Sequence, residues 1–136
     1  MNNVLAPAQP IMVVDDEEAI LYSIDTVLRM AGLNNIIVCN DSRKVMDIIA
    51  RNHIGIILLD LSMPYLRGEE ILSMVCSSFP EILVIIITAS ANEECAIRCK
   101  KYGAFDYVIK PVEESRLLTA VTRAISFHDT KRQMDL

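Results

Sequence analysis

Four short runs of apolar residues constrain this chain most, because each run stops at a polar residue. The runs are residues 11–14 before Asp15 and Asp16, residues 56–59 before Asp60, residues 83–87 before Thr88, and residues 107–109 before Lys110. Continuous apolar runs of this length suit strands that are buried on both faces of a parallel sheet. Ligands of open parallel sheets bind outside the carboxyl ends of the strands. We therefore expect three carboxylates, a hydroxyl and an ammonium group along one edge of a single sheet.

Helical patterns alternate with these runs, and a fifth strand is expected at residues 36–39. Apolar residues spaced three to four apart mark one face of each predicted helix. These residues are Ile20, Leu21, Ile24, Val27, Leu28 and Ala31; Val45, Met46, Ile48 and Ile49; Ile71, Leu72, Val75 and Phe79; Cys95, Ala96, Cys99 and Tyr102; and Leu117, Leu118, Val121, Ala124 and Ile125. Five strands alternating with five helices predict an α/β fold, a doubly wound parallel sheet with helices on both faces. The strand order 2-1-3-4-5 of flavodoxin-like folds is one of the two common orders for such a sheet.

The length of 136 residues fits one domain. We expect a flexible leader at residues 1–10, the domain at 11–127, and a polar tail or clipped linker at 128–136. A net charge of −5 argues against direct nucleic-acid binding. A signal-peptide pattern is missing, and no apolar run approaches the ~20 residues that cross a bilayer. These features predict a cytoplasmic protein without a membrane segment.

The four cysteines predict buried thiols rather than a metal site or a disulfide. None of them forms a CxxC pair, although Cys95 and Cys99 lie one helical turn apart. A metal pair at these two positions would lack further ligands nearby in the sequence.

The acidic residues at the strand ends predict a cation site. Asp15, Asp16 and Asp60 would repel one another at one sheet edge unless a cation neutralised them. A few carboxylate oxygens with several waters suit Mg²⁺, and Mn²⁺ should substitute for it. The alternative for Asp15 and Asp16 is that they only complement the dipole of the helix that follows.

Asp60 has the surroundings of a nucleophile. A carboxylate beside a divalent cation, the Lys110 ammonium and the Thr88 hydroxyl can attack phosphorus and form an acyl phosphate. The metal and the ammonium would neutralise charge on the transferred group, and no general base is required. We expect no organic cofactor.

Residues 10–127 resemble the receiver domain of two-component response regulators, the CheY-like family. The residues that carry the resemblance are Val13-Val14-Asp15-Asp16, Leu59-Asp60-Leu61-Ser62-Met63-Pro64 with Gly68, and Gly103-Ala104-Phe105-Asp106-Tyr107-Val108-Ile109-Lys110-Pro111. The resemblance implies that Asp60 is phosphorylated and that Asp16, Asp15 (mainly through water), Asp60 and the backbone carbonyl of Ser62 hold Mg²⁺. It also implies that Thr88 and Lys110 contact the phosphoryl group and that the Lys110-Pro111 bond is cis.

Two roles are possible for Tyr107: it is either a core aromatic residue on the last strand or a switch residue coupled to Thr88. The resemblance favours the switch, in which phosphorylation repacks the surface of the fourth helix, last strand and fifth helix. The implied partners are a sensor histidine kinase or phosphotransfer protein and an output domain or effector. A homodimer through the same surface is a further expectation.

The predicted function is therefore a signalling module that catalyses its own phosphorylation and dephosphorylation, rather than an enzyme with an external substrate. One alternative is a phosphohydrolase of the haloacid-dehalogenase type, which carries a second Asp two residues after the nucleophile, where this chain has Ser62. Another is a pseudo-receiver that serves only for docking, which would have lost one or more site residues.

Overall fold

A computed structural model describes residues 7–134 of the chain. Strands and helices alternate along it, with one short 3₁₀ turn after the second strand. The elements are β1 (Ile11–Val14), α1 (Glu18–Met30), β2 (Ile36–Cys39), η1 (Ser42–Lys44), α2 (Val45–Arg51), β3 (Ile56–Asp60), α3 (Gly68–Ser78), β4 (Leu83–Thr88), α4 (Glu93–Tyr102), β5 (Asp106–Ile109) and α5 (Glu114–Met134). The five strands and five helices that the sequence predicts are all present.

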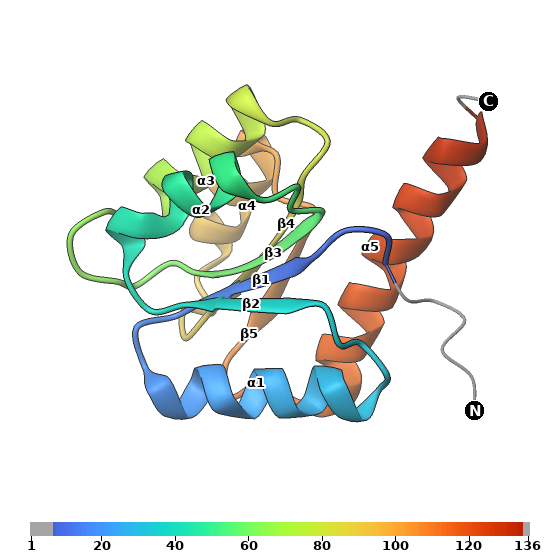
Figure 1. Cartoon of the computed structure of the whole chain (residues 1–136). Coiled ribbons are helices and arrows are strands. Elements are labelled where there is room, and N and C mark those ends of the chain that lie inside the picture. The colour runs from blue at the N-terminus through green and yellow to red at the C-terminus, as the bar shows by residue number, and fades with distance from the viewer. Residues whose placement is uncertain (1–6, 135–136) are drawn as a thin grey trace.

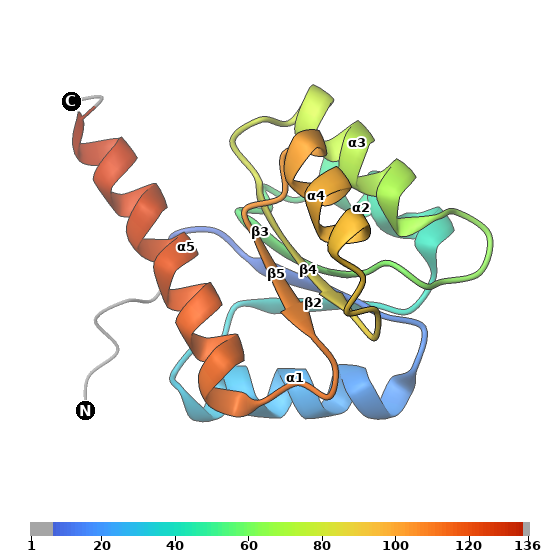
Figure 2. The same ribbon diagram turned by 180° about the vertical axis from the view of Figure 1, so that it is seen from behind.

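The strands form one parallel sheet in the order β2-β1-β3-β4-β5. Helices α1 and α5 cover one face of the sheet, and α2, α3 and α4 cover the other (Figures 1 and 2). The strand order reverses at β1, which has β2 on one side and β3 on the other, and ligands of such sheets bind at this kind of switch point. The doubly wound, flavodoxin-like fold is confirmed.

The sheet separates two hydrophobic cores, because successive side chains of a strand point to opposite faces. Met12, Leu59 and Ile86 pack with α2, α3 and α4. Leu58 and Ile87 belong to the second core, which contains the buried faces of α1 and α5. Each helix thus contributes one apolar stripe, as the residue spacing predicts. Two predicted members of these stripes are wrong, because Tyr102 of α4 is exposed and Ala31 lies exposed just after the end of α1.

The two edge strands, β2 and β5, are more exposed than strands that are buried on both faces of a sheet. Strands β1 and β3 are buried throughout, whereas Ile109 of β5 is 46% exposed and Val38 of β2 is 50% exposed. An edge strand has a neighbour on one side only, so the helices cover it less completely. The expectation of full burial is therefore wrong for β5.

Helix α5 continues to Met134, so the polar segment after residue 127 is helical as far as residue 134. The ring of Phe127 packs edge-to-face on Phe105, with centroids 5.7 Å apart. A ring nitrogen of His128, Nε2, lies 2.9 Å from the carbonyl oxygen of Glu81. These contacts hold the C-terminal part of α5 against the rest of the protein. This part of the helix has no continuous apolar stripe of its own.

The cysteines are free thiols. Cys39, Cys95 and Cys99 are buried as expected, and Cys76 is half-buried. Between residues 7 and 134 there is no helix with the length and apolar character that crossing a membrane requires.

Candidate functional site

Three carboxylates meet at the carboxyl end of the sheet. Asp15 directly follows β1 and is 1% exposed, and Asp60 is the last residue of the neighbouring strand β3 and is 3% exposed. Asp16 is exposed at the rim. One oxygen of each residue lies within 4.8 Å of an oxygen of the other two. The parallel pairing of β1 with β3 brings these residues together, although they are far apart in the sequence.

Lys110 reaches this acidic cluster from the end of β5. Its Nζ lies 2.9 Å from Oδ2 of Asp15 and 3.5 Å from Oδ1 of Asp60, and a longer contact of 3.9 Å joins it to Glu17. The bond between Lys110 and Pro111 is cis, as the resemblance implies. Lys110 contacts Asp60, as the sequence predicts, but its shortest contact is with Asp15.

The electrostatics of the site disfavour a charged Asp60. Burial, followed by the nearby charge of Asp15, raises the pKa of Asp60, although the Ser62 amide and Lys110 act against this shift. Burial alone would lower the pKa of Lys110, but its hydrogen bond to Asp15 and the charges of Asp15 and Asp60 raise it overall. The site therefore holds one ammonium group among three carboxylates, so a further positive charge would be favourable there.

The donor atoms of the acidic cluster fit a hard divalent cation. All of them are carboxylate oxygens, on two buried residues and one exposed residue. A small number of carboxylates with an open side toward solvent suits Mg²⁺, which keeps several of its waters. Asp15, Asp16 and Asp60 are the residues that would hold such an ion.

Thr88 and Tyr107 are connected through Ser90. The buried Thr88 hydroxyl accepts a hydrogen bond from the Ser90 amide at 3.2 Å. The Tyr107 hydroxyl donates to the Ser90 carbonyl at 3.0 Å, and its ring lies partly buried against the core of the α2–α4 side. The loop after β4 thus links the end of that strand to β5.

The loop after β3 starts at Asp60 and is closed by Gly68. The Ser62 amide donates to Oδ1 of Asp60 at 3.2 Å. The Gly68 amide donates to the Leu61 carbonyl at 3.2 Å, and a Cβ atom on Gly68 would collide with the Cα atom of Leu61. Gly68 is therefore required for the close approach of α3 to the end of β3.

Two residues near the site were not singled out from the sequence as functional. Glu17 donates its backbone amide to Oδ1 of Asp15 at 2.9 Å, and its side chain makes the long contact to Lys110. The hydroxyl of Ser42 binds the loop after β3. The run of acids from Asp15 onward is a local signal for Glu17, whereas nothing local in the sequence points to the contact of Ser42.

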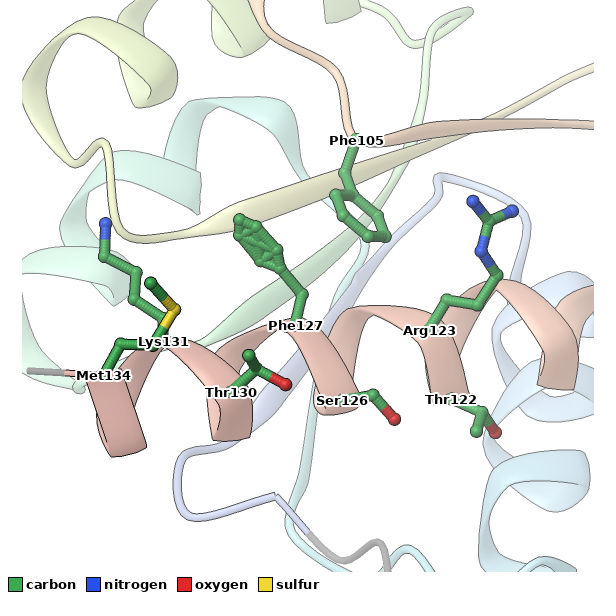
Figure 3. A pocket seen from close by; sticks show the side chains of 8 residues that line it. All are labelled: Phe105, Thr122, Arg123, Ser126, Phe127, Thr130, Lys131 and Met134. Atoms are coloured by element: carbon green, nitrogen blue, oxygen red, sulfur yellow. The ribbon is translucent and has the colours of Figure 1, made fainter.

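A large hollow of about 820 Å³ lies along α5, away from the acidic cluster (Figure 3). Its apolar lining includes Phe105, Phe127 and Met134, and Arg123 and Lys131 add positive charge. The chemically capable residues are instead clustered at the carboxyl ends of the strands.

Comparison with known proteins places these features in a family. Residues 11–122 match the family model described as the response regulator receiver domain. The regulatory protein AtoC of Escherichia coli K12 is 32% identical over 124 residues, which are 91% of this chain and 27% of that protein. The chain spans about a quarter of the length of the curated relatives that it matches.

Solved structures agree with this match. The structure of NtrX from Brucella abortus in complex with ATP is 27% identical, with a TM-score of 0.85 over 94% of this chain and 29% of that one. The BeF3-activated receiver domain of DrrB, a protein of Thermotoga maritima, is 28% identical, with a TM-score of 0.78 over 87% of this chain and 97% of that one.

Proposed function

The chain belongs to the response regulator receiver domain family, and on this premise we propose that Asp60 accepts a phosphoryl group in a Mg²⁺-dependent reaction. The donor is the phosphohistidine of a sensor histidine kinase or of a phosphotransfer protein. The observation that carries the proposal is the meeting of Asp15, Asp16 and Asp60 with Lys110 at the carboxyl ends of three strands.

The reaction requires an ionised Asp60 that is held in place. Its carboxylate oxygen forms a bond to phosphorus while the bond from phosphorus to the donor nitrogen breaks, and the electron pair leaves with that nitrogen. The Ser62 amide and the Lys110 ammonium orient the carboxylate and favour its charged form. A bound Mg²⁺, held by Asp15, Asp16, Asp60 and the Ser62 carbonyl, would supply the missing positive charge, and Mn²⁺ should replace it.

Thr88 and Tyr107 carry the signal from the site in this proposal. The Thr88 hydroxyl turns toward the phosphoryl oxygens and gives up its bond with the Ser90 amide. Tyr107, whose hydroxyl is bound to the Ser90 carbonyl, repacks as that loop moves. The result is a population shift of the α4-β5-α5 surface.

The α4-β5-α5 surface would contact an output domain, an effector or a second copy of the chain. Asp106 of β5 already bonds the Arg116 guanidinium of α5 at 2.9 Å, so a movement of β5 reaches α5 directly. Ile97 of α4 and Ile109 of β5 provide exposed apolar area on this surface. Modification of the domain by itself, without an external substrate, and a cytoplasmic location belong to the same proposal.

Labelling with a radioactive small phosphodonor tests the proposal. We expect hydroxylamine-sensitive label on the wild-type protein when Mg²⁺ is present, and none on Asp60→Asn. An Asp47→Asn variant is the matched control, because Asp47 is an exposed carboxylate on α2. Equal labelling of Asp60→Asn and wild type would refute the assignment of Asp60.

Beryllium fluoride distinguishes a switch from a docking module. The DrrB receiver domain is known in a BeF3-activated form. We expect beryllium fluoride with Mg²⁺ to change the NMR chemical shifts of the backbone amides in α4 and β5 of this protein. The same amides should keep their chemical shifts in Asp60→Asn. If beryllium fluoride leaves the amide signals of the wild-type protein unchanged, the result would favour a domain that serves only for docking.

A further inference from the structure

The loop between β3 and α3, residues 61–67, is held at two separate places. Its base is closed by the bond from the Gly68 amide to the Leu61 carbonyl. The base also contains Ser62, whose amide bonds the Asp60 carboxylate. The second attachment is at the tip, and it comes from a different part of the chain.

The Ser42 hydroxyl makes the second attachment. It donates to the Pro64 carbonyl at 2.6 Å and accepts from the Leu66 amide at 3.0 Å. Ser42 is 1% exposed and belongs to η1, the turn that follows β2. A single hydroxyl therefore bridges the backbone on both sides of one loop residue, Tyr65.

Tyr65 has an unusual backbone conformation and a second contact with η1. Its φ angle of 76° makes it the one non-glycine residue between positions 7 and 134 with a positive φ. Such a conformation is strained for a residue with a Cβ atom and persists when its surroundings fix it. The guanidinium of Arg43 lies over the Tyr65 ring, 3.7 Å from the centroid. Asp41 holds this guanidinium through bonds of 3.0 and 2.9 Å.

We propose that Ser42, with Arg43, positions the loop that carries Ser62, and thereby sets the Mg²⁺ affinity of the Asp60 site. This inference rests on the proposed function. The two attachments fix the loop relative to both β3 and the β2 edge of the sheet. Without the Ser42 hydroxyl, the tip loses two hydrogen bonds, and the strained Tyr65 relaxes. The Ser62 peptide, at the base of the same loop, then loses its fixed position beside Asp60. Ser42 is a positioning residue, since it touches neither Asp60 nor the other two acids.

The test compares Ser42→Ala with a matched loss of hydroxyl at Ser77, which bonds the Ser73 carbonyl at 2.8 Å on the exposed side of α3. Calorimetric titration with Mg²⁺ alone should show an affinity about ten-fold weaker in Ser42→Ala, the lower end of the effect of removing a residue that supports metal ligands. Ser77→Ala should bind Mg²⁺ as the wild type does. Labelling of Ser42→Ala by a small phosphodonor should recover at saturating Mg²⁺, because the reacting groups are intact.

Hydrogen exchange without metal provides the second readout. The Leu66 amide should exchange at least about ten-fold faster in Ser42→Ala, because its bond partner is lost, whereas amides of the central strands should be unchanged. Should Ser42→Ala not fold, Arg43→Gln replaces it, since Arg43 is an exposed residue. It should weaken Mg²⁺ binding in the same direction by a smaller factor.

The outcomes separate this inference from the proposed function. If the wild type takes up Mg²⁺ and the folded variant, Ser42→Ala or its replacement Arg43→Gln, binds it equally well, the positioning role is refuted and the proposed function stands. If the wild type takes up no Mg²⁺, both are refuted. Weaker binding in Ser42→Ala with unchanged exchange at Leu66 would also refute the positioning role, because the loop would not have moved.

Discussion

Replacing Asp60 by asparagine should stabilise the metal-free protein at neutral pH. The carboxylate is almost completely buried, and burial is the main cause of its raised pKa. A carboxyl group with a raised pKa in the folded state binds its proton more tightly than in the unfolded chain. Its ionisation therefore lowers the free energy of unfolding as pH rises from the unfolded pKa, 3.8, through the folded pKa. The asparagine side chain would carry no charge and would keep an oxygen for the Ser62 amide.

The magnitude follows from the neighbouring charges. A carboxylate oxygen of Asp15 lies within 4.8 Å of a carboxylate oxygen of Asp60. At an effective dielectric constant of ~20, the repulsion between two negative charges at this distance is roughly 3.5 kcal/mol. Lys110 lies 3.5 Å from Asp60, which gives roughly 4.7 kcal/mol of attraction. These two effects nearly cancel and the exposed Asp16 adds weak repulsion, so the burial cost of several kcal/mol decides the sign. After allowance for the hydrogen bond from Ser62, we expect a gain of about 2 kcal/mol, or about 5–8 °C in Tm.

Urea unfolding followed by circular dichroism, in the presence of a chelator, measures this effect. The difference between Asp60→Asn and wild type should be fully developed at about pH 7 and should shrink as pH falls toward the unfolded pKa. Added Mg²⁺ should also shrink it, because only the wild type gains much from binding the ion. The surface control Asp47→Asn should differ from wild type by no more than about 0.5 kcal/mol. An Asp60→Asn protein that is equally or less stable than wild type at pH 7 would refute the reasoning.

Three further substitutions have expected outcomes in thermal or urea unfolding. Lys110→Met removes the cation that faces two buried carboxylates, so the free energy of unfolding without Mg²⁺ should fall by about 3 kcal/mol; an unchanged midpoint would contradict the ion-pair geometry. Gly68→Ala pushes a Cβ atom into the backbone of Leu61, and a loss of about 2 kcal/mol is expected; wild-type stability would show that the loop moves freely. Gly103→Ala places a side chain at a φ of 110°, with its Cβ atom 2.9 Å from Sγ of Cys76, and should cost about 1–2 kcal/mol; a neutral result would mean that the end of α4 adjusts.

Sequence patterns predict the fold because the central strands are buried on both sides. A run of four aliphatic residues such as residues 56–59 is typical of an inner strand, and the carboxyl ends of parallel strands share one edge. That rule alone brings Asp15 and Asp60 together. The patterns do not tell an edge strand from a central one, so the exposure of Ile109 was not predicted.

Contacts between distant segments explain the remaining differences. The last turns of α5 lack an apolar stripe, and they are held by residues such as Phe105 that lie earlier in the chain. The preference of Lys110 for Asp15 over Asp60 depends on side-chain geometry at the ångström level. Ser42 looks like a local cap because serine is common at helix starts, and only the folded chain shows that its hydroxyl bonds residues 22 and 24 positions away.

The division of the interior by the sheet has a consequence for how such a domain can diversify. Side chains above and below the strands belong to different apolar clusters, so energetic effects on the two sides should be largely additive. The core residues under α2, α3 and α4 can thus be exchanged with little effect on the packing of α1 and α5, and the reverse. The strand backbones are the shared element, and Asp60 and Thr88 lie at their tips, where a chemical event can influence both layers at once.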